Sequence, residues 1–374
     1  MIRLLLAALI LATAGLRVSV AVADEPVTLK VSRDEQNALW KARIEGFLAK
    51  GVLPLIDLES SLPFRTGGGD IEDAAAEMDR LAIAVIAFEA QQTPMDGRPG
   101  YRWSYKSHEV VNRFPDRFAL ATNGGDNPNW TRQADGANSM IVQLERQAPK
   151  DEYRIFGEFE FRHYMSAQQC KGGRDDRDIK VPLESDNGRR LFKLAEETGK
   201  AVIIHLEPED EELTSLDRTL AAFPKARIVV AHFGQLRHPE RAKGYSAARI
   251  RDLMTRHRNL FYDISTGPPG RTYQCNGGIM DVALWQEGGY KGQLDTLKPE
   301  YKALLTDFSD RFVAGFDFGG GRKRLPVFIG ERAANIRLII RDLPEPARHA
   351  IAYRNAWKML TGTDWPAAVT TTAR

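Results

Sequence analysis

The chain has 374 residues, of which 43% are hydrophobic, so it can bury the core of one barrel-sized domain or two ordinary domains. Its 52 basic and 50 acidic residues leave a formal net charge of +2, which excludes a strong overall field for nucleic acid or an anionic membrane. The expected partner is therefore a small neutral or mildly anionic substrate.

The first 23 residues have the pattern of a secretory signal peptide. Arg3 precedes an apolar stretch from Leu4 to Ala14, and Ala21-Val22-Ala23 forms a small-residue cleavage site. This stretch is too short to span a bilayer comfortably, and no later segment is long and apolar enough to do so. We expect a periplasmic or secreted protein with a domain over residues 24–366 and a frayed tail over 367–374. An uncleaved N-terminal anchor is the alternative, although Arg17 interrupts its apolar run.

Short apolar runs alternate with segments of helical period along the rest of the chain. The predicted strands are Val52–Glu59, Ile83–Phe88, Phe118–Asn123, Tyr153–Phe161, Ala201–Leu206, Arg227–His232, Leu260–Ser265 and Arg311–Asp317. The predicted helices are Ile71–Arg80, Ala137–Arg146, Asn187–Thr198, Leu213–Ala222, Ala247–Arg256, Glu300–Phe308, Ile329–Arg341 and Pro346–Gly362. This alternation predicts a (β/α)8 barrel, also called a TIM barrel, whose active site lies at the carboxyl ends of the strands. A doubly wound sheet is the alternative, but the first strand lacks a following G-x-G-x-x-G.

Two of the predicted loops at the active-site end are long. One follows the fourth strand from about His163 to Glu184, and the other follows the seventh strand from about Thr266 to Lys298. Each loop carries one of the two cysteines of the chain, Cys170 and Cys275. A disulfide between them would join the loops over the barrel mouth, while two free thiols remain the alternative.

Polar residues end several of the predicted strands and should converge at one face. His205 and His232 each terminate an apolar run, and Asp317 closes the last strand. Imidazole and carboxylate ligands suit one divalent ion, with zinc the first choice and manganese or iron the alternatives. We expect Glu59, His205 and Asp317 to hold it, with Asp57 supporting Glu59 and His232 orienting or deprotonating the reacting group. The other histidines with charged neighbours are expected at the surface: His108, His238, His257 and His349.

The fourth strand is unusually polar. Glu158, Glu160 and Arg162 share one face of an extended chain, and His163 faces the other way if the strand continues that far. These residues form either a buried network of charges or a substrate-binding surface in which Arg162 pairs with a carboxylate.

Five segments in order resemble the amidohydrolase superfamily, in particular its amidohydrolase-related branch of metal-dependent hydrolases and decarboxylases. VIIHLE resembles the family's fifth-strand histidine segment and KARIVVAHFGQ its sixth-strand segment. NLFYDIS resembles the seventh strand, RFVAGFDFGGG the eighth strand with its aspartate, and AYRNAWKMLTG the C-terminal segment. The resemblance covers nearly all of the chain after the signal peptide.

The first strand departs from the family pattern. Most members have D-x-H-x-H with two metal-binding histidines, whereas this chain has Asp57-Leu58-Glu59-Ser60-Ser61. Glu59 stands at the first histidine position and Ser61 at the second, where a serine hydroxyl is a poor zinc ligand. The resemblance therefore implies at most one metal ion, and some decarboxylases of this branch carry glutamate at the first position.

Three functions follow from these residues. The first is a metal-dependent hydrolase in which Asp317 or His232 takes a proton from water as it attacks an ester, lactone or amide carbonyl. The second is a metal-dependent non-oxidative decarboxylase of an aromatic acid. The third is a metal-free barrel that binds a ligand or partner through its long loops.

Overall fold

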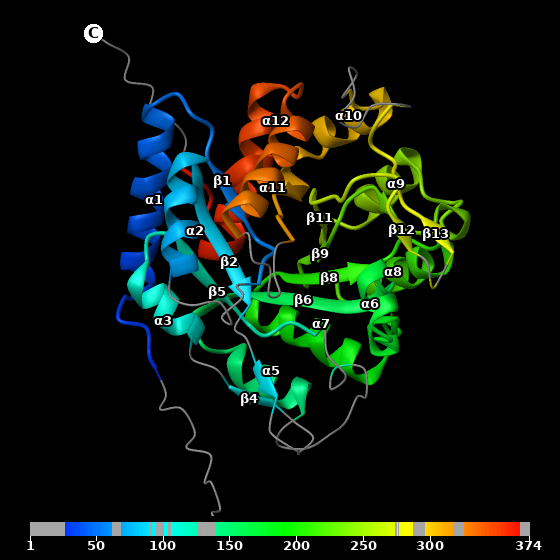
Figure 1. Ribbon diagram of the computed structural model, residues 1–374, viewed down its shortest axis with the longest axis horizontal. Coiled ribbons are helices and arrows are strands. Elements are labelled where there is room, and N and C mark those ends of the chain that lie inside the picture. Colours follow the sequence, from blue (N-terminus) through cyan, green and yellow to red (C-terminus); the bar gives the residue numbers. More distant parts are fainter. Residues whose placement is uncertain are drawn as a thin grey trace, which may run out of the picture.

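Eight strands form one parallel sheet in the order β1-β2-β5-β6-β8-β9-β11-β15 (Figure 1). Their bounds are β1 Leu55–Asp57, β2 Ile83–Glu89, β5 Phe118–Ala121, β6 Tyr153–His163, β8 Val202–Leu206, β9 Ile228–Val230, β11 Leu260–Asp263 and β15 Phe312–Val313. The computed structural model describes residues 27–61, 69–89, 92–94, 101–103, 106–125, 130, 139–273, 275, 277–286, 296–317 and 325–366. The predicted signal peptide and tail lie outside these ranges.

Backbone hydrogen bonds close the sheet between its first and last strands. The amide of Leu58 donates to the carbonyl of Ala314 at 3.3 Å, and the amide of Asp317 donates to the carbonyl of Glu59 at 2.8 Å. The sheet is therefore a barrel, which confirms the predicted (β/α)8 architecture. These two bonds also fix the end of β1 beside the end of β15.

A helix follows each barrel strand and covers the outside of the sheet (Figure 1). In chain order these are α2 Gly69–Arg80, α3 Lys106–Arg113, α5 Met140–Gln147, α7 Asp186–Thr198, α8 Asp210–Ala222, α9 Ala247–Arg256, α10 Pro299–Asp307 and α11 Leu325–Ile340. The strands are buried on both faces, because side chains fill the barrel and helices cover its exterior, so they read as continuous apolar runs.

Further helices lie at both ends of the described chain. Helix α1, Arg33–Ala49, begins with a capping box between Ser32 and Glu35 and buries Trp40 and Ile44 against the barrel. The last segment contains α12 Glu345–His349, a π-helical turn over Ala350–Arg354 and α13 Asn355–Thr361, close to the predicted helix. No helix within the described ranges has the length and apolar character that a membrane crossing needs.

The predicted long loops after the fourth and seventh strands contain short elements. The first loop holds α6 Ala167–Lys171, a 3-10 turn over Asp175–Arg177 and β7 Ile179–Lys180, which pairs with β6. The second holds the hairpin of β12 Thr272–Tyr273 and β13 Gly278–Ile279, followed by β14 Asp281–Val282, which pairs with β10 Gln235–Leu236. A further small hairpin, β3 Gln92–Pro94 with β4 Tyr101–Trp103, follows β2.

Candidate metal centre

A cavity of about 280 Å³ lies at the carboxyl ends of the barrel strands, and we call it the central cavity. Among the residues proposed from the sequence, those that line it are Glu59, Ser61, Glu158, Glu160, His163, His205, His232 and Asp317. The remaining lining residues are Leu58, Ser60, Ala121, Gly157, Tyr164, Ser166, Gln169, Arg177, Ile203, Arg237, Arg271 and Tyr273. Residues far apart in the sequence therefore meet at one site, as barrel topology requires.

Glu158, His205 and His232 form a first group of metal-ligand atoms within 4.8 Å of one another. The His205 Nδ1 atom lies 2.9 Å from Glu158 Oε1 and 3.1 Å from His232 Nε2. On its other side, His205 Nε2 lies 3.1 Å from Glu207 Oε1, a carboxylate that fixes the orientation of the ring.

Glu59, His232 and Asp263 form a second group, which shares His232 with the first. The hydroxyl oxygen of Ser265 lies 2.8 Å from Glu59 Oε2, 2.6 Å from Asp263 Oδ1 and 2.7 Å from His232 Nδ1. The other carboxylate oxygens, Glu59 Oε1 and Asp263 Oδ2, are buried and have no hydrogen-bond partner among the described residues. A buried carboxylate oxygen without a partner is unfavourable unless a cation or a proton neutralises it.

The spacing of these atoms fits a small divalent ion. Ligand atoms about 2.1 Å from a tetrahedral zinc ion lie about 3.4 Å from one another. His232 Nε2 lies 3.6 Å from Glu59 Oε1, 3.7 Å from Glu158 Oε1 and 3.1 Å from His205 Nδ1. Nitrogen and oxygen donors of these types suit zinc, with manganese or iron as alternatives. The donor set is therefore compatible with metal, and His232 lies at its middle.

Asp317, which the sequence analysis places among the ligands, belongs to neither group of described residues. It lines the same cavity, with 41% of its side chain exposed, and its Oδ2 atom lies 3.4 Å from a guanidinium nitrogen of Arg332. Asp317 and His232 both adopt positive φ angles, 45° and 63°. Non-glycine residues in this left-handed region cluster at functional sites.

Burial and neighbouring charges shift the pKa values of the ionisable groups in the site. Burial, together with the charges of Asp263 and Glu158, raises the pKa of Glu59 well above its usual range. Burial and Arg237 act to lower the pKa of His205, but hydrogen bonds to Glu158 and Glu207 raise it to about 9. Burial and the charge of His205 lower the pKa of His232. A bound cation would take the place of the protons that these groups otherwise share.

Asp57 supports the site from behind. Its Oδ1 atom accepts hydrogen bonds from the backbone amides of Glu59 and Phe316, each at 2.9 Å, and Oδ2 bonds the Ser60 hydroxyl. One fully buried carboxyl group thus ties the end of β1 to the end of β15. Its side chain holds the backbone from which Glu59 and Asp317 project.

Arg162 does not line the central cavity; it is buried and pairs with Asp178 and Glu209, as in the first of the two alternatives for the fourth strand, a buried network of charges. The pairing of β6 with β8 shifts register on both sides of Glu160, which breaks the simple alternation of side chains. Arg162 donates to Asp178 at 2.8 Å and lies over the Tyr164 ring at 3.6 Å, so the β7 loop neutralises its charge. The same shift turns His163 into the cavity.

Several residues of the site escape the sequence analysis: Glu207, Arg237, Asp263 and Ser265. Asp263 and Ser265 lie at the end of a predicted strand, as His232 does, so their position in the sequence could have indicated that they belong to the site. Glu207 and Arg237 form an ion pair of 2.9 Å between two different loops, which no local pattern indicates. His108 and His238 are buried rather than exposed, and the His238 ring lies 4.0 Å from that of Tyr164.

The family model Amidohydro_2, described as amidohydrolase, matches residues 140–362, more than half of the chain. A comparison with curated protein sequences gave no match.

Three solved structures are among those to which this chain is similar. A TatD homologue from Escherichia coli has 12% identity and a TM-score of 0.48, over 82% of this chain and 97% of that one. An amidohydrolase from Burkholderia multivorans with bound zinc has 10% identity and a TM-score of 0.44, over 83% and 99%. A 2,6-dihydroxybenzoate decarboxylase complexed with 2,6-dihydroxybenzoate has 12% identity and a TM-score of 0.44, over 83% and 100%. By its family-model match, this chain belongs to the amidohydrolase family.

Proposed function

We propose that this protein is an exported metal-dependent hydrolase that acts on a carbonyl group of a small substrate, an ester, lactone or amide. The observation that carries the proposal is the pair of buried carboxylate oxygens, Glu59 Oε1 and Asp263 Oδ2, without hydrogen-bond partners among the described residues. Both converge on His232 at the carboxyl end of the barrel. A divalent ion held by His232 and Glu59, with Asp263, His205 and Glu158 as the other candidate ligands, would neutralise this arrangement.

The proposed chemistry divides between the ion and the chain. A bound divalent ion lowers the pKa of water from near 16 to about 7 and polarises a carbonyl oxygen. Asp317, at the more exposed edge of the cavity, takes the proton of the attacking water and passes it to the leaving group. Burial lowers the pKa of His163 well below its usual range, so this ring stays neutral and can hydrogen-bond the substrate.

Metal analysis and ester hydrolysis test the proposal together. We expect the purified protein, reconstituted with zinc, manganese or iron, to bind close to one equivalent of metal and to hydrolyse 4-nitrophenyl acetate. His232→Asn should lose both metal and activity, whereas His257→Asn, a histidine paired with Asp217 away from the cavity, should lose neither. A folded wild-type protein that binds less than about a tenth of an equivalent, where one full site is expected, contradicts the proposal.

A decarboxylase remains the second candidate, and the specific observation in its favour is Glu59. This carboxyl stands where most of the family has a histidine, and burial raises its pKa, so it could donate a proton to carbon. Carbon dioxide release from hydroxybenzoates without ester hydrolysis would favour this reaction.

A metal-free barrel that binds a ligand is the third alternative from the sequence. Such a protein would keep its ligand affinity in His205→Ala, whereas the proposed enzyme would lose metal and activity.

Export is the part of the proposal that concerns residues 1–23. The first supporting feature is the N-terminal pattern, in which Arg3 and an apolar stretch precede the Ala21-Val22-Ala23 site. The second is the disulfide between Cys170 and Cys275, because disulfides persist in oxidising compartments. Mass spectrometry of the protein from a periplasmic or culture fraction should give Asp24 as the first residue. Recovery of the full-length chain from the cytoplasm alone would contradict export.

A further inference from the structure

Within the described ranges, three arginines line the central cavity, and they differ in how their charges are balanced. Arg177 pairs with Glu160 at 2.5 Å, and Arg237 pairs with Glu207 at 2.9 Å. Arg271 is exposed and has no carboxylate partner among the described residues. Among the described residues that line the cavity, Arg271 is thus the cation that a bound anion can neutralise without displacing a protein carboxylate.

A continuous path of contacts runs from the metal centre to Arg271. His205 Nε2 lies 3.1 Å from Glu207, which pairs with Arg237. The guanidinium of Arg237 lies 5.4 Å from the centroid of the Tyr273 ring, and that of Arg271 lies 5.3 Å from the same centroid. Tyr273 is only 1% exposed, so its ring is a fixed platform. Arg271 therefore lines the same cavity as the candidate ligands and contacts a buried ring that Arg237 also contacts.

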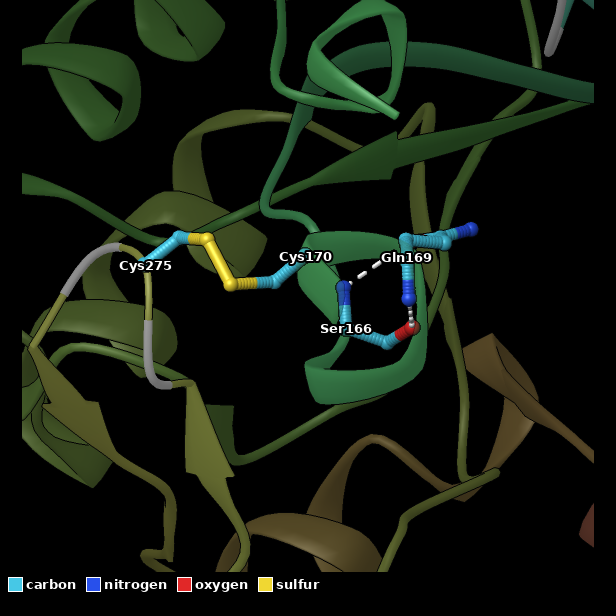
Figure 2. Close-up of a disulfide and its surroundings, with 4 residues drawn as sticks. All are labelled: Ser166, Gln169, Cys170 and Cys275. Atoms are coloured by element: carbon cyan, nitrogen blue, oxygen red, sulfur yellow. Dashed lines mark hydrogen bonds between the residues drawn. A yellow bond between two sulfur atoms is a disulfide. The ribbon is translucent and has the colours of Figure 1, made fainter. Parts of the chain in front are cut away.

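The disulfide joins the two loops that carry Gln169 and Arg271 into the lining of the cavity. Figure 2 shows Cys170 next to Gln169 on α6, bridged to Cys275 in the hairpin of β12 and β13. Gln169 and Tyr273 both line the cavity, one residue and two residues from the bridged cysteines. The hairpin itself has only two residue pairs, and a two-stranded hairpin of this size is marginal alone. Backbone hydrogen bonds connect Met280 with Gly270 and Arg271, and the bridge adds a covalent connection from the hairpin to α6.

We propose that Arg271 determines specificity by binding an acidic group of the substrate, and that the Cys170–Cys275 disulfide positions it. The substrate class is then a small molecule with a reacting carbonyl at one end and a free carboxylate at the other, such as a half-ester or half-amide of a dicarboxylic acid. This inference rests on the proposed function, since it assigns the second end of the same substrate.

Binding of simple carboxylates to the metal-loaded protein tests the inference without requiring turnover. Calorimetric titration with malonate, succinate, glutarate and adipate, at constant ionic strength, varies the distance between the two carboxylates of the ligand. The member that binds most tightly indicates the separation between the metal centre and Arg271. At least one dicarboxylate should bind about 10-fold or more tightly than butyrate, because its second carboxylate accepts a charge-assisted hydrogen bond from Arg271. The inference is wrong if no member of the series exceeds butyrate.

Variants distinguish a direct contact with Arg271 from the effect of removing one positive charge anywhere on the protein. Arg271→Gln should remove the preference for the dicarboxylate while leaving butyrate affinity unchanged, and Arg271→Lys should restore part of it. Arg249→Gln, which removes an equal charge from the outer helix α9, should leave the preference intact. Retention of the preference in Arg271→Gln would overturn the assignment.

The disulfide has its own readout. The double variant Cys170→Ser, Cys275→Ser, verified as folded by circular dichroism, should lose most of the dicarboxylate preference and keep butyrate affinity. An unchanged preference would overturn the positioning role of the bridge. A protein that prefers dicarboxylates but hydrolyses no ester refutes the proposed function alone, whereas one that hydrolyses esters without this preference refutes the inference alone.

Discussion

Asp57→Ala should destabilise the barrel at the place where it closes. The substitution removes the shared acceptor of two buried amides, those of Glu59 and Phe316. Each buried donor left unpaired costs about 1 to 3 kcal/mol, so we expect a loss of about 2 to 6 kcal/mol. This is a large part of the 5 to about 15 kcal/mol that stabilises a typical domain. Urea unfolding of the metal-free protein, followed by tryptophan fluorescence, measures the change without a contribution from bound metal.

Asp57→Asn is the matched variant. Burial raises the pKa of Asp57 well above its usual range, so a neutral amide resembles the group that the site favours. Its carbonyl oxygen can keep both backbone hydrogen bonds, and we expect only a small loss of stability. Asp186→Ala, with a side chain that is 83% exposed, is the surface control and should change little. The reasoning fails if Asp57→Ala costs less than about 1 kcal/mol, the lower limit for one unpaired donor, or if asparagine costs as much as alanine.

Two further predictions concern packing and pH. Gly188→Ala should lower the free energy of unfolding by about 1 to 3 kcal/mol, because a Cβ there would collide with the Leu183 carbonyl. Gly46→Ala in α1 should raise it by up to about 1 kcal/mol, because nothing lies within 4 Å of the added Cβ and alanine favours helix. Equal changes for the two variants in urea unfolding would contradict this. Burial lowers the pKa of Lys200 to about 8, so between about pH 8 and the unfolded value near 10.4 the unfolded chain binds more protons and stability rises with pH. Lys200→Met should reduce this rise in urea titrations across that range, and an identical slope in both proteins would refute the assignment.

The barrel was readable from sequence because its signals are local. Each parallel strand is buried on both sides and appears as an apolar run, and polar residues such as Glu59 and His205 mark where the run ends. Helix α1 carries equally local signals, the Ser32 capping box and the buried pair Trp40 and Ile44, which the sequence analysis did not use.

The details of the site depend on information that sequence spacing lacks. The face that Arg162 presents depends on register shifts between β6 and β8, which arise from pairing rather than from either strand alone. His238 is buried because Tyr164 from another loop covers it. Asp317 lies outside both ligand groups and has a φ of 45°, a local conformation that its place at the end of an apolar run does not indicate.

The bridge between Cys170 and Cys275 also encloses a covalent ring of the chain with a sequence separation of 105. Three candidate ligands lie inside that ring: His205 on β8, His232 two residues after β9 and Asp263 at the end of β11. A single cut by a protease at any loop between Lys171 and Tyr273 would leave both fragments covalently attached. In an oxidising compartment that contains proteases, a nicked molecule would thus keep its histidines beside Glu59 instead of losing them by diffusion.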